Sequence, residues 1–191
     1  MNILLLGPQG SGKGTQAKRI EAEYALPHVS TGDMFREAIA RGTPLGLQVE
    51  PILASGALVP DELTVGLIRE RLAEEDAKEG FVLDGFPRNR AQAEALDQLL
   101  AELGRPLEVV FEFQLDDGVC VERMLKRARD EGRVDDTPEV IGRRLEIYHR
   151  ETAPLVEHYR TGGRLVGIHA DRSVGAVWAE IQAALDQAEA A

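Results

Sequence analysis

The sequence predicts an α/β fold in which a parallel sheet is covered by helices on both faces. Short apolar runs alternate with longer segments whose apolar residues recur every three or four positions. This alternation of buried strands and amphipathic helices is typical of parallel sheets, because the connecting helices cover both faces. The 191 residues suffice for one core with small excursions, and they contain no internal repeat and no long linker.

The individual elements follow from apolar runs and from their spacing. The strand candidates are 2–6, 80–83, 107–115 and 164–168, with a weaker one at 27–29. Helical spacing covers 63–72, 91–103, 139–159 and 174–188. Asp61 and Thr137 are candidate N-caps, because short polar side chains accept hydrogen bonds from the free amides at a helix start. Gly42 is a candidate helix stop.

The composition excludes several classes of function. The 33 acidic residues outnumber the 22 basic ones, and the formal net charge of −11 argues against a general binder of nucleic acid or of anionic membranes. No apolar run approaches the roughly 18 residues of a membrane span, and the run at 2–6 is too short for a secretory signal. We therefore expect a cytoplasmic protein without nucleic-acid or membrane partners. The single cysteine, Cys120, excludes an internal disulfide and a multi-cysteine zinc site, and we expect it to be a packing residue.

Basic residues are concentrated in one stretch, where eight of the 22 lysines and arginines fall within 28 positions. They are Arg123, Lys126, Arg127, Arg129, Arg133, Arg143, Arg144 and Arg150. One interpretation is a solvated helix face on which these cations pair with neighbouring acids. The other is a site for a highly charged anion. Position along the chain does not decide between them, but the glycine-rich loop near the N-terminus favours the second.

That loop connects the first predicted strand to the first helical segment. It reads Gly7-Pro8-Gln9-Gly10-Ser11-Gly12-Lys13-Gly14-Thr15. Glycines adopt backbone angles closed to other residues, so successive amides can face phosphate oxygens, and the positive end of the following helix points to the same place. Lys13 adds a charge for the β- and γ-phosphates, and Thr15 adds a hydroxyl for phosphate or Mg²⁺-bound water. Gly14 stands where the general phosphate-loop pattern has Ser or Thr.

Three further motifs accompany the loop. They are Ser30-Thr31-Gly32-Asp33-Met34-Phe35-Arg36, Gly56-Ala57-Leu58-Val59-Pro60-Asp61 and Phe81-Val82-Leu83-Asp84-Gly85-Phe86-Pro87-Arg88. Asp84 ends an apolar strand, where a carboxylate beside a phosphate loop can orient the waters of Mg²⁺. Arg36 and Arg88 carry planar guanidinium groups that can bind two phosphate oxygens at once. Together with the Gly-Lys-Gly-Thr-Gln form of the loop, these motifs resemble the adenylate kinase family, and the resemblance covers nearly the whole chain.

The resemblance implies the P-loop nucleoside kinase fold, with a five-stranded parallel sheet in the order 2-3-1-4-5. The expected parts are a core (1–29, 60–125 and 137–191), an NMP-binding part that holds the nucleoside monophosphate (30–59) and a lid (126–136). Long-lid relatives carry an insertion in the lid, often with zinc-binding cysteines. This chain has neither, so the resemblance implies a short-lid form without zinc.

The resemblance also implies the site residues. The expected ATP-binding residues are Gly10, Ser11, Gly12, Lys13, Gly14, Thr15, Arg127 and Arg172. The expected AMP-binding residues are Thr31, Arg36, Ala57, Leu58, Val59, Gly85, Phe86, Pro87, Arg88, Gln92, Arg133 and Arg144. The expected catalytic residues are Lys13, Arg88, Arg123, Arg127, Arg133 and Arg144. Gln92 would read the adenine edge of AMP, and the backbone at Arg172 would touch the adenine of ATP. Ala57 stands where many relatives have a longer side chain, so we expect a backbone contact there.

The implied activity is reversible phosphoryl transfer from Mg·ATP to AMP, giving two ADP, by a monomer. Phosphoryl transfer requires positioning and charge stabilisation rather than a protein nucleophile, which suits a site rich in lysine and arginine. Asp84 would hold Mg²⁺ through water. We expect His28, His149, His158 and His169 to be structural or surface residues. Because an open site risks ATP hydrolysis, the NMP-binding part and the lid should both move.

Three alternatives change the function. A UMP/CMP kinase would keep the fold and change the acceptor, but Thr31 and Gln92 favour AMP over the Ala and Asn usual in pyrimidine relatives. A regulatory GTPase would need a guanine motif of the form Asn/Thr-Lys-x-Asp, which is absent. A binding module without turnover would not need the full set of arginines.

Overall fold

The computed structural model describes residues 1–189, so positions 190 and 191 of the predicted core lie outside the described residues. Five parallel strands form one sheet in the order β2-β3-β1-β4-β5, which confirms the prediction. The strands are β1 (Asn2–Leu6), β2 (His28–Ser30), β3 (Phe81–Asp84), β4 (Val109–Gln114) and β5 (Leu165–His169).

The central strand β1 is buried along its whole length, because helices cover both faces of the sheet. In register, Ile3 lies opposite Val82 of β3 and Val109 of β4. Since side chains alternate along a strand, Leu4 joins the core on one face and Ile3 the core on the other. The run of apolar residues at 2–6 is therefore explained by burial on two sides.

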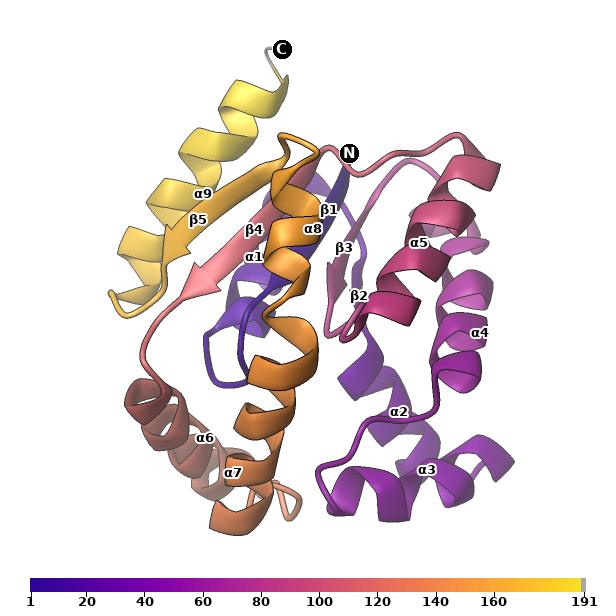
Figure 1. Ribbon diagram of the computed structural model, residues 1–191, viewed down its shortest axis with the longest axis vertical. Helices are drawn as coiled ribbons and strands as arrows, with labels where there is room; N and C mark the ends of the chain where they lie inside the picture. The colour runs from indigo at the N-terminus through magenta and orange to yellow at the C-terminus, as the bar shows by residue number, and fades with distance from the viewer. Residues whose placement is uncertain (190–191) are drawn as a thin grey trace.

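Two sets of helices make these faces. On the Ile3 face lie α1 (Lys13–Tyr24) and α9 (Val174–Glu189). On the Leu4 face lie α4 (Asp61–Leu72), α5 (Arg90–Leu103) and α8 (Leu155–Arg160), and Figure 1 shows α8 crossing in front of the central strands. A short 3₁₀ helix, Glu75–Ala77, leads back into β3.

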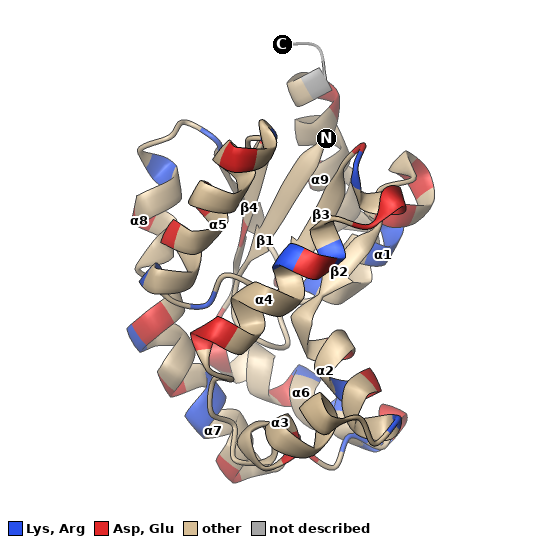
Figure 2. Cartoon of the chain, turned by 90° about the vertical axis from the view of Figure 1, so that its right-hand side faces the viewer, with Lys and Arg blue, Asp and Glu red and all other residues tan. Residues whose placement is uncertain are grey.

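Four more helices extend beyond the carboxyl ends of the strands (Figure 1, Figure 2). These helices are α2 (Thr31–Ala40), α3 (Pro44–Ala54), α6 (Asp117–Glu131) and α7 (Pro138–Ile147). The first pair has a small core of its own around Phe35 and Val49. The second pair packs around Cys120 and Met124, so the free Cys120 is a buried packing residue, as expected.

The predicted helix at 139–159 is three segments rather than one. Between α7 and α8 lies a π-helical turn, Tyr148–Thr152, in which the Ala153 amide donates to the Tyr148 carbonyl at 2.8 Å. Pro154 follows, and it has no amide hydrogen with which to continue an α-helical ladder. The spacing of apolar residues could not reveal this, because the wider turn lasts only five residues.

Of the two predicted caps, one is correct and one is wrong. The Thr137 hydroxyl accepts the Val140 amide at 3.3 Å, as expected of an N-cap. Asp61, however, is the first residue inside α4, and its carboxylate caps no amide of that helix. It accepts instead from the side chains of Asn89 and Gln92 at the start of α5.

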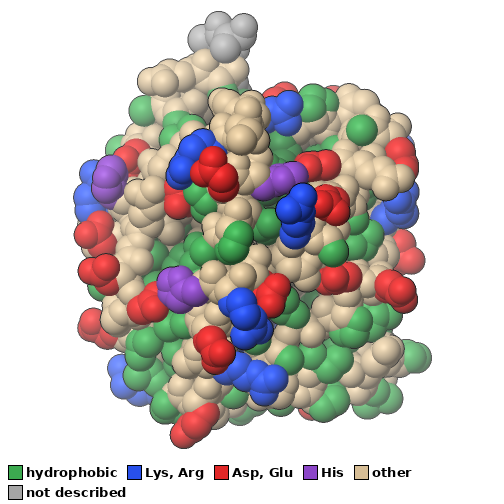
Figure 3. All heavy atoms as spheres, viewed as in Figure 1, with side chains coloured by type: hydrophobic (Ala, Val, Ile, Leu, Met, Phe, Trp, Pro, Cys, Tyr) green, Lys and Arg blue, Asp and Glu red, His purple; other side chains and the backbone are tan. Residues whose placement is uncertain are grey.

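The surface mixes both signs of charge. On the face in Figure 3, Lys and Arg lie beside Asp and Glu, and α4 in Figure 2 likewise carries both signs. Within residues 1–189, no helix combines the length and the apolar character needed to span a membrane.

Candidate active site

The candidate residues gather in a cleft at the carboxyl ends of the strands. The cleft has a volume of about 610 Å³ and is lined by residues of α2 and α3 on one side and of α6 and α7 on the other. Open α/β sheets bind their ligands at this edge, because the loops that leave the strands meet there.

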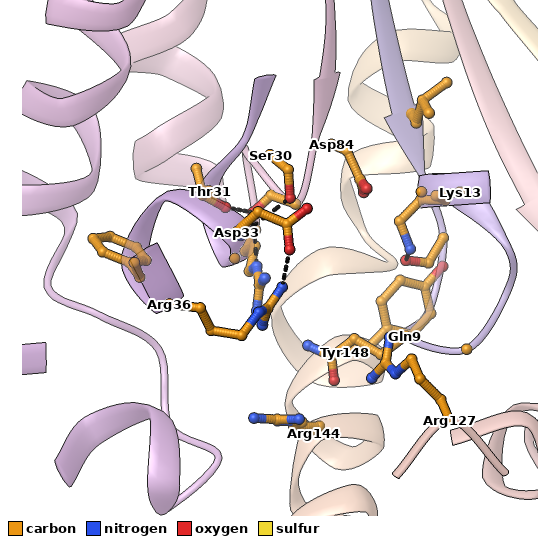
Figure 4. Close-up of a pocket in the computed structure, with 18 of the residues that line it drawn as sticks. Gln9, Lys13, Ser30, Thr31, Asp33, Arg36, Asp84, Arg127, Arg144 and Tyr148 are labelled. Carbon is orange, nitrogen blue, oxygen red and sulfur yellow. Dashed lines mark hydrogen bonds and ion pairs between the residues drawn. The ribbon is translucent and has the colours of Figure 1, made fainter. Parts of the chain in front are cut away.

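The glycine-rich loop forms one wall of the cleft. Gly10 and Gly12 have φ angles of 82° and 92°, in the left-handed region that favours glycine, and α1 begins directly after them at Lys13. The Lys13 ammonium folds back over its own loop and donates to the carbonyls of Gly7 and Pro8 at 2.7 and 2.8 Å (Figure 4). Burial lowers the pKa of Lys13 to about 8. A desolvated cation is thus held where it can meet an anion.

Asp84 lies beside this loop, at the end of β3 (Figure 4). A β-carbon placed on Gly14 would lie 3.5 Å from Asp84 Oδ2, so the carboxylate lies against the start of α1. Burial would raise the pKa of Asp84, but the His28 hydrogen bond and the Lys13 charge outweigh it, and the pKa is lowered. The His28 Nε2 atom is 3.4 Å from Asp84 Oδ2. The carboxylate therefore stays charged beside the phosphate loop.

The Gly85 carbonyl joins two residues predicted to bind the monophosphate. It accepts from the Thr31 hydroxyl at 2.9 Å and from Arg88 Nε at 2.7 Å. The Arg88 backbone is held as well, because its carbonyl accepts from the Thr152 hydroxyl at 2.6 Å and its amide donates to Gln92 Oε1 at 2.8 Å. Burial lowers the pKa of Arg88 to about 10, which leaves the guanidinium charged at neutral pH.

Arg36 reaches the same cleft from α2. Its guanidinium donates to Asp33 Oδ1 at 2.5 Å, and the Ser30 hydroxyl caps the helix by accepting the Asp33 amide at 3.3 Å (Figure 4). Burial would raise the pKa of Asp33, but the Arg36 hydrogen bond and charge outweigh it and lower the pKa. The Asp33 carboxylate therefore positions Arg36.

Arg127 of α6 and Arg144 of α7 are paired with the two aspartates at the end of the predicted lid. The Asp136 side chain is fully buried and accepts from Arg127 at 2.6 and 3.0 Å and also from Arg144. Asp135 accepts a second bond from Arg144 at 2.7 Å. Arg133 pairs with Glu131 at 2.7 Å. Asp135 and Asp136 thus form one ion-pair network with Arg127 and Arg144.

Most of the predicted site residues line this single cleft. From the glycine loop they are Gly10, Gly12, Lys13, Gly14 and Thr15. From the segments after β2 and β3 they are Thr31, Arg36, Ala57, Leu58, Val59, Asp84, Gly85, Pro87, Arg88 and Gln92. From α6, α7 and their connection they are Arg123, Arg127, Arg133 and Arg144.

Three predicted residues lie elsewhere. Ser11 and Arg172 line a second hollow of about 260 Å³, which shares Gly12, Thr15 and Arg123 with the walls of the cleft. The Arg172 side chain pairs with Glu180 of α9. The role predicted for Arg172 concerns its backbone and does not need this side chain. Phe86 is 1% exposed and belongs to the hydrophobic core, where it supports the residues that follow it.

The cleft reverses the charge balance of the chain. Nine lysines and arginines line it against four acidic residues, although the whole chain has a net charge of −11. This excess favours a polyvalent anion, and it decides between the two interpretations of the basic cluster. Among the described residues, no group of three or more His, Cys, Asp or Glu side chains could hold a metal ion by itself.

Sequence reasoning missed three residues that support the site. His28 was expected to be structural, and its partner Asp84 is 56 positions away. Thr152 reaches Arg88 only because the π-helical turn carries it there, so no sequence pattern could have revealed it. Asp61 was predicted as a cap, although its position at the end of the Gly56–Asp61 motif placed it near the cleft.

Comparison with known proteins agrees with this geometry. A family model described as adenylate kinase matches residues 5–164. An adenylate kinase of a Cyanothece species is 49% identical over 185 residues, which are 97% of this chain and 95% of that protein. Another, from Methylorubrum populi, is 47% identical over 192 residues, with 97% and 96% of the two chains covered. A third, from Xanthomonas euvesicatoria, is 44% identical over 97% of this chain and 99% of its own. With this agreement along almost its entire length, the chain belongs to the adenylate kinase family.

Proposed function

We propose that this enzyme transfers the terminal phosphoryl group of Mg·ATP to AMP and produces two ADP. One observation carries the proposal: the Lys13 loop and the Arg88 guanidinium face one cleft, with the charged Asp84 carboxylate near both. A phosphate chain bound by the Lys13 loop and a single phosphate bound by Arg88 would then lie in the same cleft. Family membership supplies the reaction class, and the cleft supplies a place for each substrate.

On the donor side, the glycine loop binds the ATP phosphates. Loop amides at Gly10 to Thr15 surround the phosphates, and Lys13 exchanges its bonds to loop carbonyls for bonds to phosphate oxygens. Arg123 and Arg127 neutralise the same chain from α6. The backbone at Arg172, beside the second hollow, contacts the adenine.

On the acceptor side, Arg36 and Arg88 bind the AMP phosphate, and Thr31 orients its nucleoside. Backbone groups of 57–59 and the Gln92 amide bind the adenine. Arg133 and Arg144 close over the transferring group, where several donors spread its negative charge over the equatorial oxygens. Closure also excludes water, which would otherwise accept the phosphoryl group.

The metal ion fits the residues that are present. Asp84 is charged and buried beside the start of α1, and it would hold Mg²⁺ through water rather than as a direct cage. When bound, Mg²⁺ would neutralise part of the phosphate charge and so favour transfer of the phosphoryl group. The protein residues then need only to position both substrates.

The positions of the residues that line the cleft also support the predicted division of the chain into a core, an NMP-binding part and a lid. The NMP-binding part at 30–59 carries Arg36 into the cleft and has a small core of its own, and the lid at 126–136 carries Arg127 and Arg133 into the cleft from between two helices that pack around Cys120 and Met124. We propose that both close on the core when nucleotides bind. We further propose a cytoplasmic monomer, which cell fractionation and light scattering would test.

The deciding experiment supplies Mg·ATP with AMP, UMP, CMP or GMP in turn and separates the products by chromatography. Rapid ADP formation with AMP alone is expected. Lys13→Ala and Arg88→Ala should lower kcat by at least about 100-fold and leave the circular dichroism spectrum unchanged. A preference for a pyrimidine acceptor would change the acceptor assignment, and near-normal turnover of either variant would refute the phosphate roles.

A further inference from the structure

The amide of Gln92 is held between two partners at the monophosphate side of the cleft. Gln92 is 2% exposed and contributes to the lining of the cleft. Its Oε1 atom accepts the backbone amide of Arg88 at 2.8 Å, and its Nε2 atom donates to Asp61 Oδ1 at 2.8 Å. Each end of the amide therefore uses one of its two hydrogen-bonding positions on the protein, and one N–H and one lone pair remain.

These two partners fix which way the amide points. A backbone N–H can only donate, and a carboxylate oxygen can only accept. If the Gln92 amide were flipped, its NH₂ group would face the Arg88 N–H and its oxygen would face Asp61. Both contacts would become repulsive, so the orientation follows from the chemistry of the neighbours.

Asp61 is itself held in place. The same Oδ1 atom accepts from Asn89 Nδ2 at 2.9 Å. Asn89 in turn caps α5, because its Oδ1 atom accepts from the backbone N–H of Gln92 at 2.9 Å. Asp61 is the first residue of α4, so these bonds join the starts of two helices beside the cleft. The carboxylate is thus built into the site although it makes no cap for its own helix.

The orientation of the Gln92 side-chain amide matters because purine bases differ in which of two neighbouring positions is the hydrogen-bond donor and which is the acceptor. A 6-aminopurine offers an acceptor at N1 next to a donor on its amino group, and the remaining N–H and lone pair of a fixed amide complement both. A 6-oxopurine reverses the two, with a donor at N1 and an acceptor at O6. It could pair only with a flipped amide, and a site with mismatched polar groups rejects such a ligand.

We propose that Asp61 is a positioning residue that holds the Gln92 amide in one orientation and thereby selects a 6-aminopurine monophosphate over a 6-oxopurine one. The proposal rests on the proposed function, because it concerns the acceptor site of that reaction. Asp61 acts through Gln92 and does not touch the base. The Arg88 amide remains as a second restraint, so the loss of Asp61 weakens the selection without abolishing it.

The test compares AMP with inosine monophosphate, a 6-oxopurine probe that lacks the bulky 2-amino group of GMP. The measured quantity is the ratio of kcat/KM for the two acceptors, with Mg·ATP as donor and the nucleotides separated by chromatography. Asp61→Ala should lower this ratio by about tenfold, which corresponds to about 1.4 kcal/mol. The amount of folded enzyme cancels in the ratio. If Asp61→Ala is not recovered folded, Asp61→Ser is measured in its place.

Two variants serve as controls. Asp61→Asn keeps an oxygen that can accept from both amides, so it should retain the wild-type ratio. Glu62→Ala removes an exposed acid from the same first turn of α4, so it should also retain the ratio.

The outcomes separate this proposal from the proposed function. If the wild-type enzyme does not phosphorylate AMP, the proposed function fails and this inference fails with it. If AMP is phosphorylated but Asp61→Ala slows both acceptors equally, Asp61 has only a structural role and the inference alone is overturned. An equal fall of the ratio in Asp61→Asn or in Glu62→Ala would also overturn it, because charge at the helix start would then explain the effect.

Discussion

Replacing Lys13 with methionine should change how the stability of the ligand-free protein depends on pH. Burial lowers the pKa of Lys13 from 10.5 to about 8, so between these values the unfolded chain binds a proton that the folded protein has released. Under that condition the free energy of unfolding rises with pH. This contribution of Lys13 to the free energy of unfolding is complete above the pKa of the unfolded chain, and it is lost as the pH falls through the pKa of the folded protein. Lys13→Met lacks this titration.

The size of the effect follows from the two pKa values. Each pH unit between them contributes about 1.36 kcal/mol, so the whole interval is worth about 3.4 kcal/mol. Between about pH 7 and about pH 10, the wild type should gain about 2.5 kcal/mol relative to Lys13→Met, because both ends of the titration are incomplete in that range. The loop carbonyls that methionine leaves unpaired shift this difference by a constant and do not alter its dependence on pH.

Urea unfolding of both proteins at several pH values, without nucleotide, measures the difference. Lys18→Met, which removes an exposed lysine from the same helix, is the matched control. A difference between wild type and Lys13→Met that stays flat, or that falls as the pH rises, would refute the account of a desolvated ammonium. Lys13→Met should also lose phosphoryl transfer, since no cation would remain in the loop.

Three further predictions concern the cleft. Arg88→Lys should lower kcat by about 100-fold with little change in thermal unfolding, because a point charge cannot reproduce a two-pronged guanidinium; near-normal turnover would contradict this. Asp136→Asn should lower the free energy of urea unfolding by about 3 kcal/mol, because it removes the buried charge that pairs two arginines, and a loss below about 1 kcal/mol would show that the pairing is weak. Gly10→Ala should lower both stability and ATP affinity, measured by thermal unfolding with and without ATP, because its β-carbon would lie 2.6 Å from the Cys120 carbonyl oxygen at a φ of 82°. Unchanged unfolding with ATP would contradict it.

The features that were predictable from sequence are those encoded locally. The strand at 2–6 matches β1 residue for residue. Lys13 lies in the glycine-rich motif after that strand, and Asp84 is the last residue of β3. The Thr137 cap depends only on the residues next to it, and it is correct. The strand order came from resemblance to a family, since apolar runs alone do not say which strands are neighbours.

The features that were not predictable depend on partners far apart in the chain. The Asp61 carboxylate had a nearby helix start to cap, yet it pairs with residues about 30 positions away, because Asn89 and Gln92 offer two donors at once. His28 reaches Asp84 only after β2 and β3 have paired. The contact of Thr152 with Arg88 depends on a π-helical turn, which the spacing of apolar residues does not predict. Long-range geometry decides each of these contacts.

The pairing of Asp135 and Asp136 with Arg127 and Arg144 affects which anions bind these two arginines. The Arg127 and Arg144 guanidinium groups already have carboxylate partners, so an incoming anion competes with those carboxylates for the same two cations. A chloride ion or a single carboxylate offers no more charge than the group it would replace. A triphosphate brings several charges and many oxygens, so it can exchange for both aspartates in one event. At Arg127 and Arg144, the two internal carboxylates therefore favour polyvalent ligands over small monovalent anions.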